Sequence, residues 1–385
     1  MKLRTSWGRT GNQEIGNYQS ISTYASGQKA VIDYVQVSTT TPSRLPNPDL
    51  KWETSEQLNF GLDFGLVKNR ISGSLDWFYK DTKDMLLNLA VPRTTGFSTM
   101  MTNIGAVRNT GVELMINSIN TEGIFNWQST LNFAWLRNEV RDLGSNKVIY
   151  SGSAGGTSNV SVIQVGLPMY SFFGYQIDGI WQQGDDLSVT NDKVAAGDFK
   201  YKDVNGDKIV NADDRVVIGN SFPKYTASLT NNMDYKNFNL NIFIDGVFDV
   251  DMLNNNLVDT YFPANLKRNR LSEPMLNRWT ESNPSTVYPS FVNPNGQGKK
   301  EVNTYTVEDA SFIRLSTVKL GYTFALRNTK YVKGLNLFLV GQNLAVISNY
   351  KGYDPSINPN GGGARIDWNA YPTARTYMMG INLSL

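Results

Sequence analysis

The stretch 203–214 contains side chains that could bind a metal ion. Oxygen-bearing side chains occupy its first, third, fifth, ninth and twelfth positions, and an apolar residue occupies the eighth. This spacing is typical of an EF-hand-like calcium loop, in which hard oxygen ligands surround the ion and the seventh residue contributes its backbone carbonyl. The predicted calcium ligands are Asp203, Asn205, Asp207, Ile209, Asn211 and Asp214.

A second interpretation of this stretch stays open, because the match is imperfect. Its sixth position holds Lys208, where a calcium loop has glycine for a sharp turn, and Asp214 reaches less far than the usual glutamate. The alternative is a surface turn rich in Asn, Asp and Gly, whose carboxylates are solvated or accept hydrogen bonds from backbone N–H groups. If calcium binds, we expect it to stiffen a long loop.

Aromatic residues form a second group of candidates. They lie among Asn and Asp in segments of loop composition, where aromatic faces suit sugar rings or peptide side chains by burial combined with hydrogen bonding. The alternative is that they pack loops against each other or against a partner protein. The candidate ligand or partner contacts are Tyr175, Trp181, Tyr261, Tyr353 and Trp368.

The composition removes most classes of enzyme. The chain has no Cys and no His, which excludes thiolate and imidazole catalysis and zinc sites built on these residues. Neighbouring carboxylates such as Asp213 and Asp214 point apart in an extended chain, so they offer no catalytic pair. A net charge of +2, from 36 Lys+Arg and 34 Asp+Glu, lacks the basic excess of a nucleic-acid-binding protein. We therefore expect neither an enzyme nor a nucleic-acid partner.

Alternation of apolar and polar residues is the main structural signal. In the segment 57–66, Leu and Phe share one face, and Gln, Asn, Asp and Gly share the other. Such a period of two predicts a β-strand with two different faces, and it recurs in roughly ten segments, each near the length that crosses a bilayer when tilted. The segments are Lys2–Gly8, Gln57–Leu66, Ile71–Tyr79, Val112–Ile116, Phe125–Trp135, Tyr225–Tyr235, Phe238–Phe248, Val318–Phe324, Leu335–Leu344 and Tyr377–Leu385.

The connections between these segments alternate between short and long. Short polar turns are expected at 67–70, 120–123, 236–237 and 327–334, and every other connection is long. Short turns at one end and long loops at the other are typical of an antiparallel transmembrane β-barrel with periplasmic turns and extracellular loops. Aromatics near the strand ends suit the two membrane interfaces. The alternative is a secreted or surface β-sandwich that binds glycans without transport, in which the apolar faces pack against a second sheet.

Several motifs resemble the SusC/RagA-like branch of TonB-dependent outer-membrane transporters. The resemblance extends over essentially the whole chain. Within one motif, Arg314 is expected to snorkel or to anchor a loop, and the alternatives are that it lines the lumen or contacts substrate carboxylates. The motifs are Leu45–Glu53, Asn103–Glu113, the segment 197–219 with its Asp-Val-Asn-Gly-Asp, Asp309–Leu315, Gly341–Leu344, Gly352–Pro355 and Tyr371–Thr376. The final residue, Leu385, differs from the aromatic residue that usually ends an outer-membrane strand.

The resemblance implies that residues 1–385 are the C-terminal portion of a 22-stranded barrel, without the plug domain and the first strands. It also implies an outer-membrane location in a Gram-negative bacterium and uptake of oligosaccharides or peptides. The implied partners are TonB, acting through a part of the protein outside this segment, a SusD-like lipoprotein over the loops, and the lipid bilayer. No cofactor is expected to be required, apart from the calcium considered above.

Overall fold

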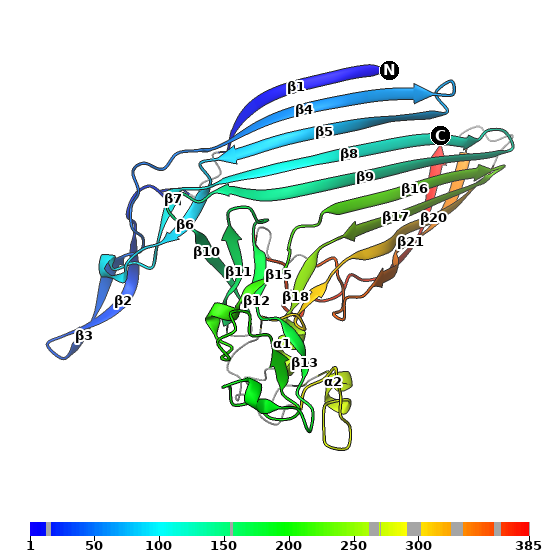
Figure 1. Ribbon diagram of the computed structural model, residues 1–385. Helices are drawn as coiled ribbons and strands as arrows, with labels where there is room; N and C mark the ends of the chain where they lie inside the picture. The colour runs from blue at the N-terminus through cyan, green and yellow to red at the C-terminus, as the bar shows by residue number, and fades with distance from the viewer. Residues whose placement is uncertain are drawn as a thin grey trace.

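One curved antiparallel sheet dominates the computed structural model, which describes residues 1–12, 17–154, 157–261, 269, 271–290, 302–324, 334–357 and 363–384. Its ten strands are neighbours in space in the order in which they follow along the chain, as expected (Figure 1). The strands are β1 (Lys2–Asn12), β4 (Glu53–Leu66), β5 (Ile71–Lys83), β8 (Ala106–Thr121), β9 (Phe125–Asp142), β16 (Tyr225–Tyr235), β17 (Phe238–Phe248), β20 (Phe312–Phe324), β21 (Gly334–Ser348) and β23 (Thr376–Ser384).

The short and long connections lie at opposite ends of this sheet (Figure 1). The tight turn between β4 and β5 places Val67, Lys68 and Asn69 at φ of 52°, 56° and 65°, and Lys236 turns the chain between β16 and β17 at φ 53°. Both chain ends lie at the end with the short turns (Figure 1). The prediction of alternating connections is confirmed, while the expected turn at 327–334 and the terminal Leu385 fall outside the described residues, apart from Gly334.

The register gives the sheet two chemically different faces. Paired residues of an antiparallel sheet share a face, and successive residues alternate between faces. Leu62, Leu75 and Leu114 therefore lie in one row across β4, β5 and β8 on the apolar face. Asp76 and Glu113 are paired on the opposite, polar face. A slip of one residue would exchange the two faces, so this pattern specifies the register.

Aromatic residues bound the apolar band at both ends. At the short-turn end Phe238 and Tyr322 are 4.7 Å apart between ring centroids, and at the loop end Phe60 and Trp77 are 5.8 Å apart. On β9 the band runs from Phe125 to Trp135, which is about 33 Å of strand at roughly 3.3 Å per residue. At a tilt near 40° that length spans about 25 Å, the height of the apolar band of an outer-membrane barrel.

The long connections contain secondary structure of their own, which the sequence analysis did not predict. Small sheets pair β2 with β3, β6 with β7, β13 with β14, β10 through β12 with β15, and β18 with β19 and β22. No helix among the described residues is long and apolar enough to cross a membrane. The elements are β2 (Tyr24–Ile32), β3 (Val35–Pro42), β6 (Leu86–Ala90), η1 (Arg93–Thr95), β7 (Thr99–Asn103), β10 (Val148–Ala154), β11 (Thr157–Gln164), β12 (Ser171–Gly174), β13 (Ile177–Ile180), η2 (Leu187–Val189), β14 (Phe199–Tyr201), η3 (Ala212–Asp214), β15 (Val216–Gly219), β18 (Asp251–Asn254), α1 (Asn255–Tyr261), α2 (Ser272–Leu276), β19 (Val307–Asp309) and β22 (Ile366–Asp367).

The buried hydrophobic residues are concentrated in these connections. Clusters centred on Phe172 and on Phe199 join the connection before β16 to the connection before β20. A third cluster packs Val107 and Val140, at the loop ends of β8 and β9, against Met169. We call the packed residues 143–224 and 249–311 that the structure describes the loop body. Val107 and Val140 belong to the polar face, so the loop body lies on that side of the sheet.

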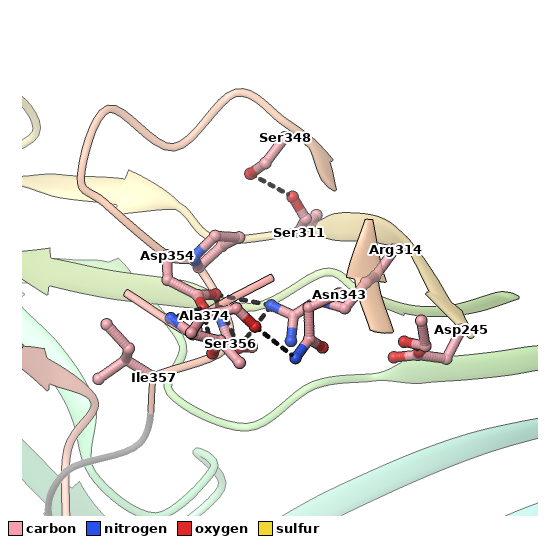
Figure 2. A network of polar contacts seen from close by, with 12 residues as sticks. Asp245, Ser311, Arg314, Asn343, Ser348, Asp354, Ser356, Ile357 and Ala374 are labelled. Carbon is pink, nitrogen blue, oxygen red and sulfur yellow. Dashed lines mark hydrogen bonds and ion pairs between the residues drawn. The ribbon is translucent and has the colours of Figure 1, made fainter. Parts of the chain in front are cut away.

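Arg314 on β20 ties the last long connection to the sheet (Figure 2). Its Nη2 atom donates to Asp354 Oδ1 and to Ser356 Oγ, each at 2.7 Å. Asp354 Oδ2 accepts bonds from the Thr373 hydroxyl at 2.6 Å and from the Thr373 N–H at 3.1 Å. Asn343 Nδ2 donates to the Ala374 carbonyl at 3.1 Å. The expectation that Arg314 anchors a loop is confirmed.

The two edges of the sheet are exposed. On β1 Leu3 and Trp7 are 83% and 69% exposed, and on β23 Met379 and Ile381 are 79% and 60% exposed. Neither edge has a further strand paired with it among the described residues. Edges of this length pair with other strands in stable proteins, because an open edge has no partner for its backbone groups inside a bilayer.

Replacing Leu131 by Arg is expected to destabilise the full-length protein in lipid by about 2–4 kcal/mol. Leu131 is paired with Ile116 and Leu229 on the apolar face, so the cation would have to leave water. The matched control is Asn132→Arg, one residue along on the polar face. Unfolding by urea in lipid vesicles measures both variants, and an equal loss of stability would contradict the assignment of the faces.

Asp354 is expected to make stability depend on pH. Burial alone would raise the pKa of Asp354, but hydrogen bonds from Thr373 and Ser356 outweigh it and lower this pKa to about 2. A carboxyl group whose folded pKa is depressed stabilises the protein above its unfolded pKa of about 3.9, and this stabilisation is lost as the pH falls through 2.

The variant Asp354→Asn should therefore lose roughly 2–3 kcal/mol at pH 7. Its deficit relative to the unmodified protein should shrink as the pH approaches 2. Urea unfolding of the full-length protein at pH 7, 4 and 2.5 measures this, with Asp178→Asn as the control at an exposed carboxylate. A deficit that is the same at all three pH values would show that the carboxylate charge is not responsible.

Candidate functional site

The polar face of the sheet forms a wall on which side chains of neighbouring strands are hydrogen-bonded to each other. Asn132 Nδ2 donates to Ser228 Oγ at 3.3 Å, and Asn241 Nδ2 donates to Asn232 Oδ1 at 2.7 Å. Such amides and hydroxyls exchange readily with water, so this face suits a wet lumen. The residues of the wall include Arg4, Asn59, Asp63, Ser74, Asp76, Glu113, Asn117, Asn132, Ser228, Asn232 and Asn241.

Charged groups on this wall are arranged in two places. Arg4 bridges Asp63 and Asp76 with N–O distances of 2.8 Å to each carboxylate. Asp76 also lines a shallow depression with a volume of about 460 Å³, together with Glu113 and Asp245. The wall therefore has an acidic depression, which would attract cationic groups of a passing solute.

A second depression lies in the loop body and is here called the loop pocket. It has a volume of about 330 Å³ and lies between η2, the β13–β14 hairpin and the stretch 203–214. The Lys200 Nζ atom lies 4.6 Å from the centre of the Trp181 ring, within the range of a cation–π interaction. The pocket is lined by Asp178, Trp181, Val189, Thr190, Asp192, Val194, Phe199, Lys200, Tyr201, Lys202, Asp203, Lys208 and Val210.

The chemistry of the loop pocket is mixed. Three carboxylates and three ammonium groups surround an aromatic floor. Such a site can pair with both ends of a zwitterionic molecule and bury an apolar part between them. The sequence analysis identified two of its members, Trp181 and Asp203, in separate hypotheses, and the fold brings them together. It did not identify Lys200 or Asp192, because nothing in their local sequence indicates that they share a pocket.

The other predicted aromatics do not gather at one site. Tyr261 is 3% exposed, and its ring centroid lies 5.5 Å from that of Phe199. Tyr175 packs against the same cluster, with its ring 5.9 Å from Tyr201. This burial favours the alternative in which these rings pack the loops together. Tyr353 and Trp368 are 68% and 44% exposed, in the last long connection. A ligand or partner role for these five residues stays a prediction.

The predicted calcium stretch folds as a compact turn stabilised by its own side chains. Asp203 accepts bonds from the N–H groups of Gly206 at 2.6 Å and Lys208 at 2.7 Å. Asn205 Oδ1 accepts from the Asp207 N–H at 2.8 Å, and the Asn205 amide donates to Asp207 Oδ2 at 3.3 Å. Lys208 adopts φ 67°, so it supplies the left-handed turn for which a calcium loop uses glycine.

The twelfth position fits calcium less well. Asp214 is fully buried, and its two carboxylate oxygens accept from the Val204 and Asn211 N–H groups, each at 2.8 Å. Burial raises the pKa of Asp214, but these backbone donors outweigh it, and the pKa lies below its usual value. Asn211 Oδ1 accepts from the Asp213 N–H at 2.8 Å. Both side chains cap η3 in the arrangement that the alternative interpretation expects.

The donor set therefore fits calcium in part. The side chains of Asn205 and Asp207 are in contact, Asp203 accepts bonds from N–H groups of the same turn, and the Ile209 carbonyl follows in the seventh position. Asp214 would have to exchange backbone partners for the ion. Among the residues that the structure describes, no group of three or more acidic side chains is arranged as a metal centre. Calcium binding stays a prediction.

Comparison with known proteins agrees with this architecture. The model of the family "TonB dependent receptor-like, beta-barrel" matches residues 1–344. TonB-dependent receptor P26 of Formosa agariphila is 32% identical over the whole chain, which covers 40% of that protein. TonB-dependent receptor SusC of Bacteroides thetaiotaomicron is 31% identical, again over the whole chain, which covers 37% of that protein.

A solved structure extends the likeness to three dimensions. A chain of the RagAB peptide transporter superposes with a TM-score of 0.80 at 27% identity, covering 99% of this chain and 40% of that one. The RagAB peptide importer in its open-open state gives a TM-score of 0.79 at 28% identity. The chain thus spans about 40% of the length of the proteins it matches. On these grounds the chain belongs to the TonB-dependent receptor β-barrel family, with the SusC/RagA resemblance confirmed.

Proposed function

We propose that this chain forms part of the barrel of an outer-membrane transporter that imports oligosaccharides or peptides with energy delivered through TonB. The observation that carries the proposal is the difference between the two faces of the sheet. One face is apolar and bounded by aromatics at both ends, which suits lipid, and the other is polar and hydrogen-bonded, which suits water. A SusD-like lipoprotein over the long loops is the proposed partner. The proposed location is the outer membrane of a Gram-negative bacterium.

The β-sandwich alternative lacks the feature that it requires. A sandwich would bury the apolar face of the ten strands against a second sheet. In the described residues, the hydrophobic clusters lie in the long connections and at the loop ends of the strands. Leu75, Leu131 and Leu320 of the apolar face are 42%, 37% and 45% exposed. Lipid accounts for these exposed side chains, and a second sheet does not.

Of the two substrate classes, the loop pocket favours peptides. Trp181 is only 4% exposed and its ring is in contact with Lys200, so it offers little free face for a sugar ring to stack upon. The carboxylates and ammonium groups around it suit the charged groups of peptides better than neutral hydroxyls. The name of the RagAB relative, a peptide transporter, is consistent with this preference.

Uptake is expected to require TonB and to weaken when Lys200 is replaced. A Lys200→Ala variant of the full-length protein should bind its peptide substrates roughly tenfold more weakly, since a charge-assisted hydrogen bond contributes about 1.5–3 kcal/mol. The measurement is uptake of labelled peptide and labelled oligosaccharide mixtures by cells that carry or lack TonB. Lys147→Ala, at an exposed lysine outside the loop pocket, is the matched control.

Two results would count against this proposal. Uptake that persists at the same rate without TonB would remove the energy source. Uptake of oligosaccharides alone, unchanged by Lys200→Ala, would remove the peptide preference and leave the barrel assignment intact.

We also propose that the stretch 203–214 binds calcium through Asp203, Asn205, Asp207 and the Ile209 carbonyl, with Asn211 and Asp214 at the remaining positions. The support is the contact between the Asn205 and Asp207 side chains, the bonds that Asp203 accepts from N–H groups of the same turn, and the left-handed backbone at Lys208. The ion would replace hydrogen bonds that now hold the turn and would stiffen one wall of the loop pocket, which Asp203 lines.

Terbium luminescence tests this site, because Trp181 lines the same pocket as Asp203 and can sensitise a bound lanthanide. The full-length protein is expected to show luminescence that calcium displaces, and the double variant Asp203→Asn with Asp207→Asn is expected to lose it. Asp213→Asn is the control, since position eleven is not a ligand position. Luminescence that survives the double variant, or that calcium fails to displace, would support the turn interpretation.

A further inference from the structure

Strand β9 extends beyond its partner β16 at the loop end of the sheet. The register between them ends at the pair of Trp135 with Tyr225, although β9 continues to Asp142. One residue further, the Leu136 N–H donates to the Lys224 carbonyl at 2.8 Å. Beyond this bond the chain that leads into β16 leaves the edge of β9, so the end of β9 has a different neighbour on this side.

That neighbour joins β9 four residues after Leu136. The Val140 N–H donates to the Leu167 carbonyl, and the Gly166 N–H donates to the Val140 carbonyl, each at 2.9 Å. Alternate residues of a strand direct their N–H and C=O groups to the same side, so Asn138 directs its own pair toward this edge. On this side the structure gives no hydrogen bond to the N–H or C=O of Asn138 from the residues that it describes.

The gap between the two bonded positions is a pocket of about 520 Å³, which Asn138 lines and which we call the seam pocket. Its lining includes Phe78 and Leu136, which are both paired with Gly111 on the polar face, and Trp135 of the apolar face. The seam pocket therefore lies at the edge of β9 between the two faces. Its apolar lining residues are Phe78, Trp135, Leu136, Pro168, Phe222 and Pro223.

The side chain of Asn138 holds this part of β9 in place. Its Nδ2 atom donates to Asn109 Oδ1 at 2.8 Å, and its Oδ1 atom accepts from the Met169 N–H at 2.8 Å. With the side chain bonded at both ends, the polar groups that Asn138 offers to a ligand are its backbone N–H and C=O. They are fixed before any ligand arrives, which reduces the entropy that binding costs.

The charges around the seam pocket have one sign. Among the described residues that line it, Arg137 and Lys224 are basic and none is acidic. Lys224 is paired with Asp249 at 2.7 Å, whereas Arg137 shares the single carboxylate of Glu139 with Arg141. Positive charge is therefore in excess, which favours a ligand with a carboxylate over a ligand with an ammonium group.

We propose that the seam pocket binds the carboxyl-terminal end of a short peptide, with the apolar side chain of its last residue in the pocket and its backbone paired with Asn138. An unpaired N–H and C=O at a strand edge is a template for pairing with another chain. A peptide residue offers the matching C=O and N–H together with a side chain for the apolar lining. Sugar hydroxyls would find few polar partners there.

The space available limits the ligand to a chain end. The bonded positions on either side, Leu136 and Val140, are four residues apart, which is roughly 13 Å of strand and room for about three residues. A longer strand would collide with the segments that contain Lys224 and Leu167. This inference rests on the peptide transport in the proposed function and adds a peptide site that is separate from the loop pocket.

Photocrosslinking to the full-length protein in detergent tests the location. The probe is acetyl-Ala-Ala-photoleucine, a tripeptide free acid whose last side chain carries a diazirine. Irradiation, proteolysis and mass spectrometry are expected to place its crosslinks within residues 135–138 and 220–224, which line the seam pocket. An excess of acetyl-Ala-Ala-Leu is expected to suppress them.

Analogues of acetyl-Ala-Ala-Leu test each part of the proposed contact, with calorimetry as the measurement. N-methylation of each amide in turn should identify one position at which binding weakens roughly tenfold, because a hydrogen bond is lost. Replacing the leucine by serine should weaken binding roughly tenfold through the lost apolar burial. Amidation of the carboxyl end should weaken it roughly fivefold through the lost charge.

The protein variant is Phe222→Ser, at a residue that is 37% exposed and lines the seam pocket. It should bind acetyl-Ala-Ala-Leu roughly fivefold more weakly, while Phe222→Leu keeps an apolar wall and should bind it nearly as the unmodified protein does. The matched control is Tyr371→Ser, at an exposed aromatic outside the pocket. Heat-modifiable migration on gels confirms that each barrel is folded, and the peptide analogues need no change in the protein.

Three outcomes would overturn the proposal: crosslinks that avoid both segments, equal binding of all N-methylated analogues and the parent peptide, or equal binding of the free acid and its amide. Normal TonB-dependent uptake of peptides without crosslinks in the seam pocket would remove this inference alone. Uptake of oligosaccharides but no peptides would remove the peptide preference on which it rests.

Discussion

The register of the ten-stranded sheet is the constraint on which the other features depend. Each strand alternates between side chains that face apolar surroundings and side chains that face water, so every residue pair across the sheet must agree in face. Pairings such as Leu75 with Leu114 and Asp76 with Glu113 satisfy this rule side by side. A shift of one residue in any strand would place several charges in hydrocarbon, each at a cost of a few kcal/mol.

The same register explains why the loops can be long and yet folded. All long connections leave from one end of the sheet and join neighbouring strands, so the two ends of each connection are held one strand spacing apart. The entropy of closing a loop grows only slowly with its length, and packing between loops can offset it. The loop body does this with hydrophobic clusters of its own, and the last long connection is tied to the sheet by the bonds from Arg314 to Asp354 and Ser356.

The strands could be predicted from the sequence because their signal is local and repeated. Segments such as Gln57–Leu66 show the alternation in every residue, and the short turns beside them have the expected polar composition. The small sheets of the loop body gave no such signal. Strand β12, for example, has four residues, of which three are buried, so its sequence cannot show two faces. Its pairing with β15 joins residues that lie more than forty positions apart.

The candidate site could be predicted only in part, because only the part of its signal that is local in the sequence could be recognised. The spacing in 203–214 is visible in the sequence. The structure shows that its side chains also accept hydrogen bonds from backbone N–H groups, which the spacing cannot reveal. Tyr261 is of a residue type that suits a ligand contact, but it is buried by Phe199 from the preceding connection and by Tyr305 from a distant part of its own connection. The row of charges from Arg9 through Glu56, Asp81 and Arg108 to Glu139 cannot be seen in the sequence, because its members come from five strands and meet only through the register.

The loop pocket links the two largest connections of the loop body. All of its lining residues belong to the connection before β16, but Phe199, Tyr201 and Val210 also pack in the cluster that contains Leu257 and Tyr261 of the next connection. A ligand that displaces the pocket floor must therefore disturb both connections, since close-packed clusters shift as units. The connection before β20 is in turn held to the last connection by the pairing of β18 with β22. A ligand in the loop pocket therefore contacts a packed unit that includes the connections before β16 and β20 and the last long connection. Arg314 joins this unit to the wall of the sheet.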